Sequence, residues 1–264
     1  MLLENKKVVI YGGGGAIAKA MAKAFAKEGA RVFLTGRSSS KLNAVADEIL
    51  MEGGTVEVAL VDALDENAVN KHLDSVINEF GSLDISFNTT GIPQTGVQGT
   101  PLIELTSESF MNPISNYLKS NFITATIAAR KMSAKKSGVI LTITAVPSKL
   151  PAPLVGGMAP SWAGIEAFTR TLAGEMGPHS IRVVCLRVDG IPETETVTTV
   201  FGLHAKGSGM PSHKEFQGLM ESFTLLKRLP KLAEVANTAV FIASDNASAI
   251  TGTTINITCG SVVD

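Results

Sequence analysis

Small residues gather directly after the first apolar run of the chain, where Tyr11 is followed by four consecutive glycines, Ala16, Ile17 and Ala18. Glycine permits a tight turn and lets backbone N–H groups approach a ligand, and positions 13, 15 and 18 match the pattern GxGxxA. A strand before this turn and a helix after it would place the helix N-terminus against a negatively charged group. The spacing predicts a cradle for the pyrophosphate of a dinucleotide rather than a merely flexible turn.

A cationic residue stands at the end of the next apolar run, which finishes with Thr35, Gly36 and Arg37. In dinucleotide-binding folds this point meets the adenosine ribose, where an acidic residue bonds the free 2′-hydroxyl and repels a 2′-phosphate. Gly36 removes that repulsion, and the planar guanidinium of Arg37 suits a phosphate. The pattern favours NADP(H) over NAD(H), and the alternative is that Arg37 is a solvated turn residue.

Short β-branched runs alternate with stretches of helical periodicity along the whole chain. Strands are predicted at residues 7–11, 31–35, 55–61, 83–88, 138–145, 181–187 and 253–258. Helices are predicted through residues 17–25, 42–49, 69–80, 107–132, 160–177 and 231–244. This alternation implies parallel strands. The predicted fold is therefore α/β, a doubly wound Rossmann fold whose seven-stranded parallel sheet carries helices on both faces, and residues 1–264 form a single domain.

One segment interrupts the alternation. Residues 192–226 are rich in Thr, Gly, Ser and His and show only weak periodicity. A connection of this length is uncommon inside a compact domain unless it serves a function. We predict that it forms a lid over a ligand site.

Composition limits the partners of the chain. Apolar residues make up 45% and charged residues 18%, and the net charge is -1 with no basic cluster, so neither nucleic acid nor a membrane surface is indicated. The first apolar run is too short for a secretion signal, and no stretch approaches the roughly 18 apolar residues of a spanning helix. We expect a cytoplasmic protein with reduced cysteines. The four histidines show no metal-ligand spacing, so no metal site is expected.

The motifs resemble those of the short-chain dehydrogenase/reductase family over essentially the whole chain. The glycine turn is similar to the family's TGxxxGxG, residues 88–91 (NTTG) stand where the family has NNAG, and the segment LLKRLPKLAEVANTAVFIASDNASAITGTTINITCG resembles the family's last helix and strand. The resemblance implies a nicotinamide dinucleotide as cofactor. It also implies the residues that line the cofactor site: Gly12, Gly14, Gly15, Ile17, Arg37, Asp62, Ala63, Asn88, Gly91 and Ile191.

The family's catalytic positions hold other residues in this chain. The family uses a Ser at the end of the fifth strand, a Tyr thirteen residues later, a Lys four residues further on, and an Asn in the preceding long helix. The corresponding residues here are Ala145, Met158, Trp162 and Tyr117, with Asn116 as the alternative for the Asn. Met158 has no proton to give, Ala145 has no hydrogen-bond donor, and Trp162 offers a neutral indole in place of an ammonium. We expect standard carbonyl reduction to be severely impaired, because the chain has no catalytic residue of the family's usual set.

Three functions remain open at this point. The first is NADP(H) binding without the usual chemistry, in which the protein senses the cofactor or pairs with an active relative. The second is an active NADPH-dependent oxidoreductase, with Tyr117 as a relocated proton donor or with a reduction that needs no protein acid. The third is a structural or regulatory protein that has lost the cofactor, because Ala16 replaces a family glycine. Ser148, Lys149 and Ser161 are expected at the solvated surface.

The family resemblance also suggests how copies of the chain assemble. Family members commonly pair through their two long helices and their last strand, and these regions are apolar here. We expect a homo-oligomer, either a dimer or a tetramer. The substrate is an unknown small molecule, because residues 192–226 contain no motif that identifies it.

Overall fold

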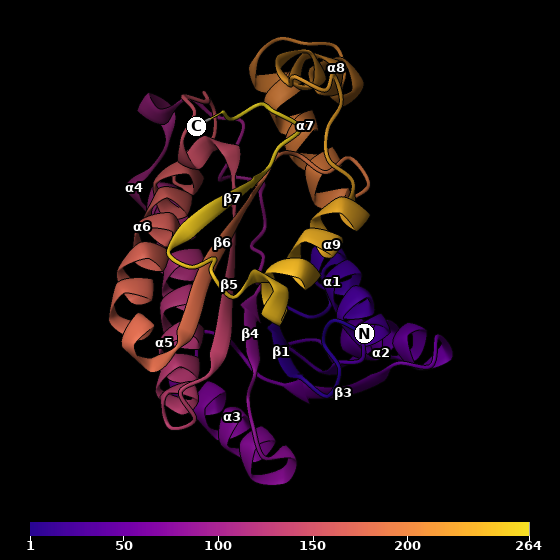
Figure 1. Ribbon diagram of the computed structural model, residues 1–264. Coiled ribbons are helices and arrows are strands. Elements are labelled where there is room, and N and C mark those ends of the chain that lie inside the picture. Colours follow the sequence, from indigo (N-terminus) through magenta and orange to yellow (C-terminus); the bar gives the residue numbers. More distant parts are fainter. Residues whose placement is uncertain (264) are drawn as a thin grey trace.

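Seven strands form one parallel sheet in the computed structural model, which describes residues 1–263 (Figure 1). The strands are β1 (Lys7–Tyr11), β2 (Arg31–Gly36), β3 (Thr55–Leu60), β4 (Ile85–Asn88), β5 (Gly138–Ala145), β6 (Ile181–Val188) and β7 (Thr253–Ile257). Their order is β3-β2-β1-β4-β5-β6-β7, so the direction of winding reverses between β1 and β4. In open parallel sheets, ligands bind in the crevice outside the carboxyl ends of the strands at such a reversal.

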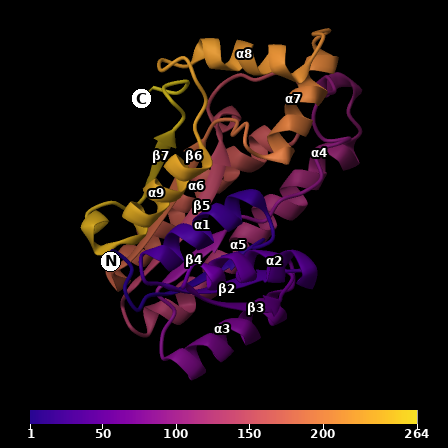
Figure 2. The same cartoon turned by 90° about the vertical axis from the view of Figure 1, so that its right-hand side faces the viewer.

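Helices cover both faces of the sheet (Figure 2). One apolar core joins the sheet to α1 (Ala16–Lys27), α2 (Ser39–Met51) and α9 (Leu232–Ala243). The other joins it to α3 (Glu66–Phe80), α5 (Lys119–Ser133) and α6 (Met158–Met176). Successive side chains of β1 enter alternate cores, because Val8 and Ile10 face the first and Val9 and Tyr11 the second. The predicted doubly wound fold is confirmed.

The long helix predicted at residues 107–132 is divided in the structure. Helix α4 (Ser107–Pro113) is followed by a π-helical turn at Ile114–Leu118, and α5 begins at Lys119. Pro113 lies at the junction and has no N–H to donate to the preceding turn, which accounts for the change in winding. Helix α6 begins at Met158, two residues before the predicted start, because Pro160 lies in the first turn, where a missing N–H costs no hydrogen bond.

Residues 192–226 contain two helices that their weak periodicity did not reveal. Helix α7 (Glu195–Gly207) is capped by Thr194, whose hydroxyl accepts from the backbone N–H of Val197, and α8 is the segment His213–Phe223. The two helices share a small apolar core, which is formed by Phe201 and Ala205 of α7, Phe216 of α8, and Leu229. Both stand beyond the carboxyl edge of the sheet (Figure 2).

Candidate functional site

The glycine turn after β1 packs closely against neighbouring parts of the chain because its residues lack side chains. Gly12 has a φ of 76°, and a Cβ at this position would lie 2.7 Å from the Cα of Thr90. The N–H of Gly13 donates to the carbonyl of Thr35 at 2.8 Å, and the N–H of Gly15 donates to the carbonyl of Gly12 at 3.1 Å. The turn is therefore a fixed, closely packed backbone loop and not a flexible linker.

The N-terminus of α1 opens directly from this turn. Gly15 caps the helix without any side-chain hydrogen bond, and the first turn holds no acidic residue. The positive end of the helix dipole and the free N–H groups of this turn remain available for an anion. Ile17 is half-buried, and Ala18 is buried in the core beneath the turn.

Cations lie beside the turn on the side of β2. A Cβ at Gly14 would lie 2.7 Å from the Cβ of Lys41, so the stem of Lys41 packs against the turn. Arg37 is exposed and makes no hydrogen bond or ion pair with any residue from 1 to 263. Gly36, between Arg37 and the end of β2, leaves the position without a carboxylate.

Two polar residues border the turn on the side of β4, and Asp62 lies after β3, on the other side of β1. The Asn88 amide donates to Thr124 Oγ1 at 3.0 Å, and Asn88 Oδ1 accepts from the N–H of Thr90 at 2.9 Å. Thr90 Oγ1 is buried and has no partner among the described residues, so it can still bond a ligand. Asp62 Oδ1 accepts from the N–H of Leu64 at 3.0 Å, which shapes the turn after β3.

The remaining residues predicted to hold the cofactor lie around the same crevice or support it. Ala63 is buried on the turn after β3, while Gly91 is exposed just after β4. Ile191 belongs to the core beneath α1 and α9, where it is 1% exposed. Two observations fit a dinucleotide in this crevice, namely a tight glycine turn in which Gly12 and Gly14 have no room for a Cβ, and the Thr90 hydroxyl, which has no partner among residues 1–263.

Three of the four positions that we align with the family's catalytic residues lie in one apolar cluster. Met158 begins α6, Trp162 follows one turn later, and Tyr117 lies on the π-helical turn. Met158 is 1% exposed and packs in one cluster with Tyr117, Trp162 and other apolar side chains. The other members are Ile92, Val97, Val155 and Ala159. Ala145 ends β5 and lies outside this cluster.

The tyrosine of this cluster remains protonated at neutral pH. Burial raises the pKa of Tyr117 to about 12, and no lysine stands at position 162 to lower it. Asn116, the alternative for the family's Asn, donates instead to the carbonyl of Asn112 at 2.9 Å on its own helix.

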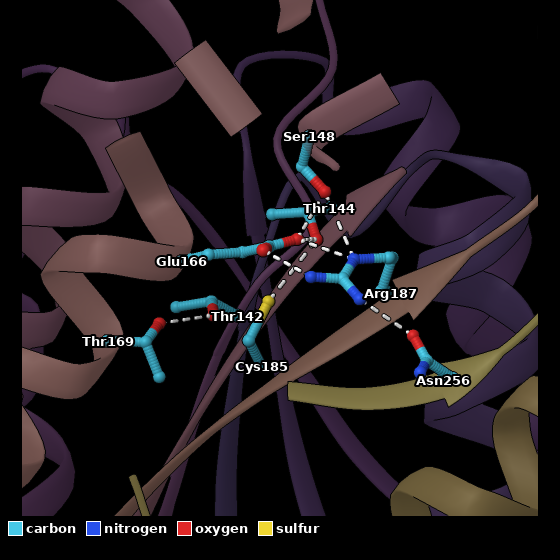
Figure 3. A network of polar contacts seen from close by, with 8 residues as sticks. All are labelled: Thr142, Thr144, Ser148, Glu166, Thr169, Cys185, Arg187 and Asn256. Atoms are coloured by element: carbon cyan, nitrogen blue, oxygen red, sulfur yellow. Dashed lines mark hydrogen bonds and ion pairs between the residues drawn. The ribbon is translucent and has the colours of Figure 1, made fainter. Parts of the chain in front are cut away.

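Ser148 and Ser161 are not at the solvated surface, contrary to expectation. Ser161 is fully buried and donates to the carbonyl of Pro113 at 3.2 Å. Ser148 is half-buried, donates to Glu166 Oε1 at 2.5 Å and accepts from Arg187 Nε at 3.0 Å (Figure 3). Lys149 is exposed, as expected, and has interaction partners of its own.

A buried ion pair that the sequence reasoning missed joins helix α6 to strand β6. Arg187 on β6 contacts Glu166 on α6 through Nη2 and Oε2 at 2.5 Å, and both side chains are no more than 7% exposed (Figure 3). Thr144, next to Ala145, donates to Glu166 Oε1, and Arg187 Nη1 donates to Asn256 Oδ1 on β7. An arginine within the apolar run of β6 was the one sequence signal for this network.

The charge of Glu166 is maintained by its neighbours. Burial by itself would raise the pKa of Glu166, but hydrogen bonds from Arg187, Ser148 and Thr144 hold that pKa below its ordinary value. The network therefore ties α6, β5, β6 and β7 together directly behind the residues at the catalytic positions.

The described residues meet the requirements of neither a metal site nor a membrane-spanning helix. Across residues 1–263, no three His, Cys, Asp or Glu side chains are grouped so that they could hold a metal ion. Within the same residues, no helix combines the length and apolar character that crossing a membrane requires.

Fold and site together define a dinucleotide-binding α/β protein, and comparison with known proteins makes the class specific. A sequence model described as enoyl-(acyl carrier protein) reductase matches residues 14–261. The chain is 28% identical over 258 residues to the Chlamydia pneumoniae protein named 3-oxoacyl-(acyl-carrier-protein) reductase FabG, covering 98% of this chain and 97% of that protein. It is 31% identical over 258 residues to the oxidoreductase YvrD of Bacillus subtilis, covering 95% and 94%.

The fold has close counterparts among solved structures. The NAD+-bound xylitol dehydrogenase superposes with a TM-score of 0.93 at 23% identity, covering 98% of this chain and 100% of that one. The chain belongs to the short-chain dehydrogenase/reductase family of oxidoreductases, whose fold binds a nicotinamide dinucleotide.

Proposed function

We propose that this protein binds NADP(H) and does not carry out the family's ordinary carbonyl reduction or alcohol oxidation. The observation that carries the proposal is the apolar cluster of Met158, Trp162 and Tyr117 at the positions that we align with the catalytic residues. The nicotinamide supplies hydride chemistry when it is bound. The protein must supply a proton and stabilise the developing oxyanion, and general acid catalysis alone contributes about 10²–10⁴ in rate.

Without those groups, the role that remains for the site is binding. Met158 has no ionisable proton, Trp162 offers only an indole N–H, and Ala145 offers no donor at all. We therefore infer that the protein senses NADP(H) or pairs with an active relative, and that its output is a conformational or assembly state.

The preference for a 2′-phosphorylated cofactor is supported by the free cations beside the glycine turn. Arg37 has no partner within residues 1–263, and Lys41 lies in the first turn of α2. Ser38, the N-cap of α2, makes no capping hydrogen bond, so the N–H groups of this helix end are free as well. A phosphate here would meet two cations and a helix N-terminus, each of which favours negative charge.

The first experiment is titration of the purified protein with NADPH and with NADH. A ligand that binds only the native state raises the melting temperature, and Trp162, the single tryptophan, gives a second signal because reduced nicotinamide quenches its emission. We expect both signals to respond to NADPH at lower concentration than to NADH. Absence of any response to either cofactor would overturn the binding proposal, and a tighter response to NADH would overturn the Arg37 assignment.

The second experiment tests the missing chemistry. Oxidation of NADPH is followed by stopped flow against ketones, enones and quinones, in the wild type and in the variant Ala145→Ser/Met158→Tyr/Trp162→Lys. We expect turnover above background only in the variant, which restores a proton donor and an ammonium. A wild type as fast as the variant would refute the proposed lack of catalysis.

One observation keeps an active enzyme as a second candidate. Tyr117 retains its proton at neutral pH and lies in the same cluster as Met158, so a phenol is present at the site. Its pKa of about 12 makes it a weaker acid than an ordinary tyrosine, which is unfavourable for proton donation. If any substrate on the panel is turned over, Tyr117→Phe should abolish that turnover, and an undiminished rate would eliminate this candidate.

A further inference from the structure

A chain of buried polar side chains connects helix α7 to the segment that follows β4. His204 Nε2 lies 3.0 Å from Gln98 Oε1, Gln98 Nε2 donates to Gln94 Oε1 at 2.6 Å, and Gln94 Nε2 donates to the carbonyl of Ile92 at 2.7 Å. The three side chains are only 5–7% exposed. Because the amide oxygen of Gln98 can only accept, His204 must carry its proton on Nε2.

Burial of these side chains is favourable only while the chain of hydrogen bonds is complete. A buried polar group without a partner costs about 1–3 kcal/mol, so loss of His204 would leave Gln98 Oε1 unpaired in an apolar setting. The ring of His204 also packs against Phe216 of α8 with centroids 5.2 Å apart, which fixes its orientation. The polar contact therefore favours one docked position of α7 over neighbouring ones.

Glycines let the backbones of the two segments touch around this contact. A Cβ at Gly99 would lie 2.9 Å from the Cβ of Leu203, and a Cβ at Gly207 would lie 2.6 Å from the carbonyl oxygen of Gly99. Gly99 also donates its N–H to the carbonyl of Leu154 at 2.8 Å, so the loop before α6 joins the same contact. Helix α7 thus lies directly on residues 92–99, a proximity that Figure 2 shows.

The inner end of the hydrogen-bonded chain reaches the apolar cluster. Ile92, whose carbonyl accepts the last hydrogen bond, packs in the cluster with Met158 and Trp162. Val97, between Gln94 and Gln98, is a buried member of the same cluster. Movement of α7 away from this segment would therefore release groups that pack on Met158 and Trp162.

We infer that His204, Gln98 and Gln94 form a polar latch that holds α7 closed over the apolar cluster, and that ligands reach this cluster when the latch opens. The inference rests on the proposed function only for the identity of the ligand. The latch consists of the chain's own side chains and can be tested without any cofactor.

The test compares His204→Leu with His204→Gln, which retains a side-chain N–H, and with His213→Asn on α8, which lies outside the latch. Amide hydrogen exchange of the intact protein reports the opening of α7. Quenching of Trp162 by acrylamide, a small neutral probe, reports access to the cluster. We expect His204→Leu to accelerate exchange within Glu195–Gly207 by about tenfold and to increase quenching, while the other two variants behave like the wild type.

A substitution of Gln98, on the other side of the contact, tests the latch without changing any residue of helix α7. Gln98→Leu should show the same local acceleration, and the double variant His204→Leu/Gln98→Leu should recover part of the protection because neither side leaves a buried polar group unpaired. Equal exchange in His204→Leu and His213→Asn would overturn the latch. So would acceleration that extends equally to β1 and β5, which would show a general loss of stability. Failure of NADPH to bind the wild type would refute the proposed function and leave this comparison intact.

Discussion

At the scale of single residues, the proposed function rests on two sets of positions, the glycine turn that would hold a dinucleotide and the positions that we align with the family's catalytic residues. Gly12 and Gly14 stand where any Cβ would meet neighbouring atoms at 2.7 Å, and the hydroxyl of Thr90 is buried without a partner beside them. At the catalytic positions, by contrast, Met158 and Trp162 pack into an apolar cluster. Under the proposed function, these two sets of residues correspond to retained binding and lost turnover.

Arg37 carries the first residue-scale prediction. We expect Arg37→Ala to weaken NADPH binding by about tenfold or more, the loss of roughly 1.5–3 kcal/mol that a charge-assisted hydrogen bond contributes, and to leave NADH binding unchanged. Isothermal titration with each cofactor measures the difference. Lys27→Ala, at the far end of α1, is the matched control. Equal losses for NADPH and NADH would show that Arg37 does not contact a 2′-phosphate.

The second residue-scale prediction concerns the buried ion pair. We expect Glu166→Gln to lower the free energy of unfolding by about 3–5 kcal/mol, because it leaves the guanidinium of Arg187 buried without its charge partner. The double variant Glu166→Met/Arg187→Met removes both charges and should cost less than the single variant. Urea unfolding curves test both statements, and a double variant as unstable as Glu166→Gln would contradict the prediction.

At the scale of elements, changes in helix geometry determine where the site residues lie. Pro113 ends α4, and the π-helical turn after it carries Tyr117 into the cluster with Met158 at the start of α6. A continuous α-helix over the same residues would rotate the side chains of this turn differently, since a π turn inserts extra residues into the helical repeat. The contact between Tyr117 and α6 therefore depends on the break.

The pH dependence of stability is a prediction about helices α3 and α7. Burial lowers the pKa of His72 on α3 and of His204 on α7, whereas in the unfolded chain both have an ordinary pKa of about 6.5. Below about pH 6.5 the unfolded state binds more protons than the folded state. The free energy of unfolding therefore has its full value above about pH 6.5 and falls as the pH decreases below it.

Urea unfolding between about pH 5 and pH 8 measures this dependence. We expect His204→Gln and His72→Gln each to flatten the decline on the acidic side. A decline that persists in full when both buried histidines are replaced would assign it to other groups.

At the scale of the whole molecule, exposed aromatic side chains suggest a surface for the homo-oligomer that we expect. Phe122 on α5 is 52% exposed and packs against Phe168 of α6, with ring centroids 5.9 Å apart. Phe241 on α9, which packs on the opposite face of the sheet, is 43% exposed. Large apolar side chains at such positions lower the free energy when a second copy covers them.

We therefore predict a homodimer or homotetramer that uses the face formed by α5 and α6. Phe122→Ser should reduce the mass measured by light scattering, because it removes apolar area from the centre of that face. Phe223→Ser on α8, where the native side chain is 64% exposed, should leave the mass unchanged. A wild type that sedimented as a monomer would contradict the prediction.

The sequence by itself determined the order of the seven strands along the chain, the parallel sheet and the family. The glycine cradle and the alignment of the catalytic positions stay predictions. These features follow from local patterns, namely apolar periodicity, glycine spacing and short motifs, which do not depend on the tertiary structure. The helices within residues 192–226 escaped this reasoning, because their stability depends on the small core around Phe201 and Phe216 more than on periodicity.

Only the tertiary structure decided which distant residues meet. Glu166 and Arg187 are 21 residues apart and His204 and Gln98 are 106 residues apart, and no local pattern pairs them. Their pairing depends on how α6 and α7 pack onto the sheet and its loops, where buried polar groups must find partners. The tertiary structure likewise brought Met158, Trp162 and Tyr117, which we align with the family's catalytic positions, into one apolar cluster.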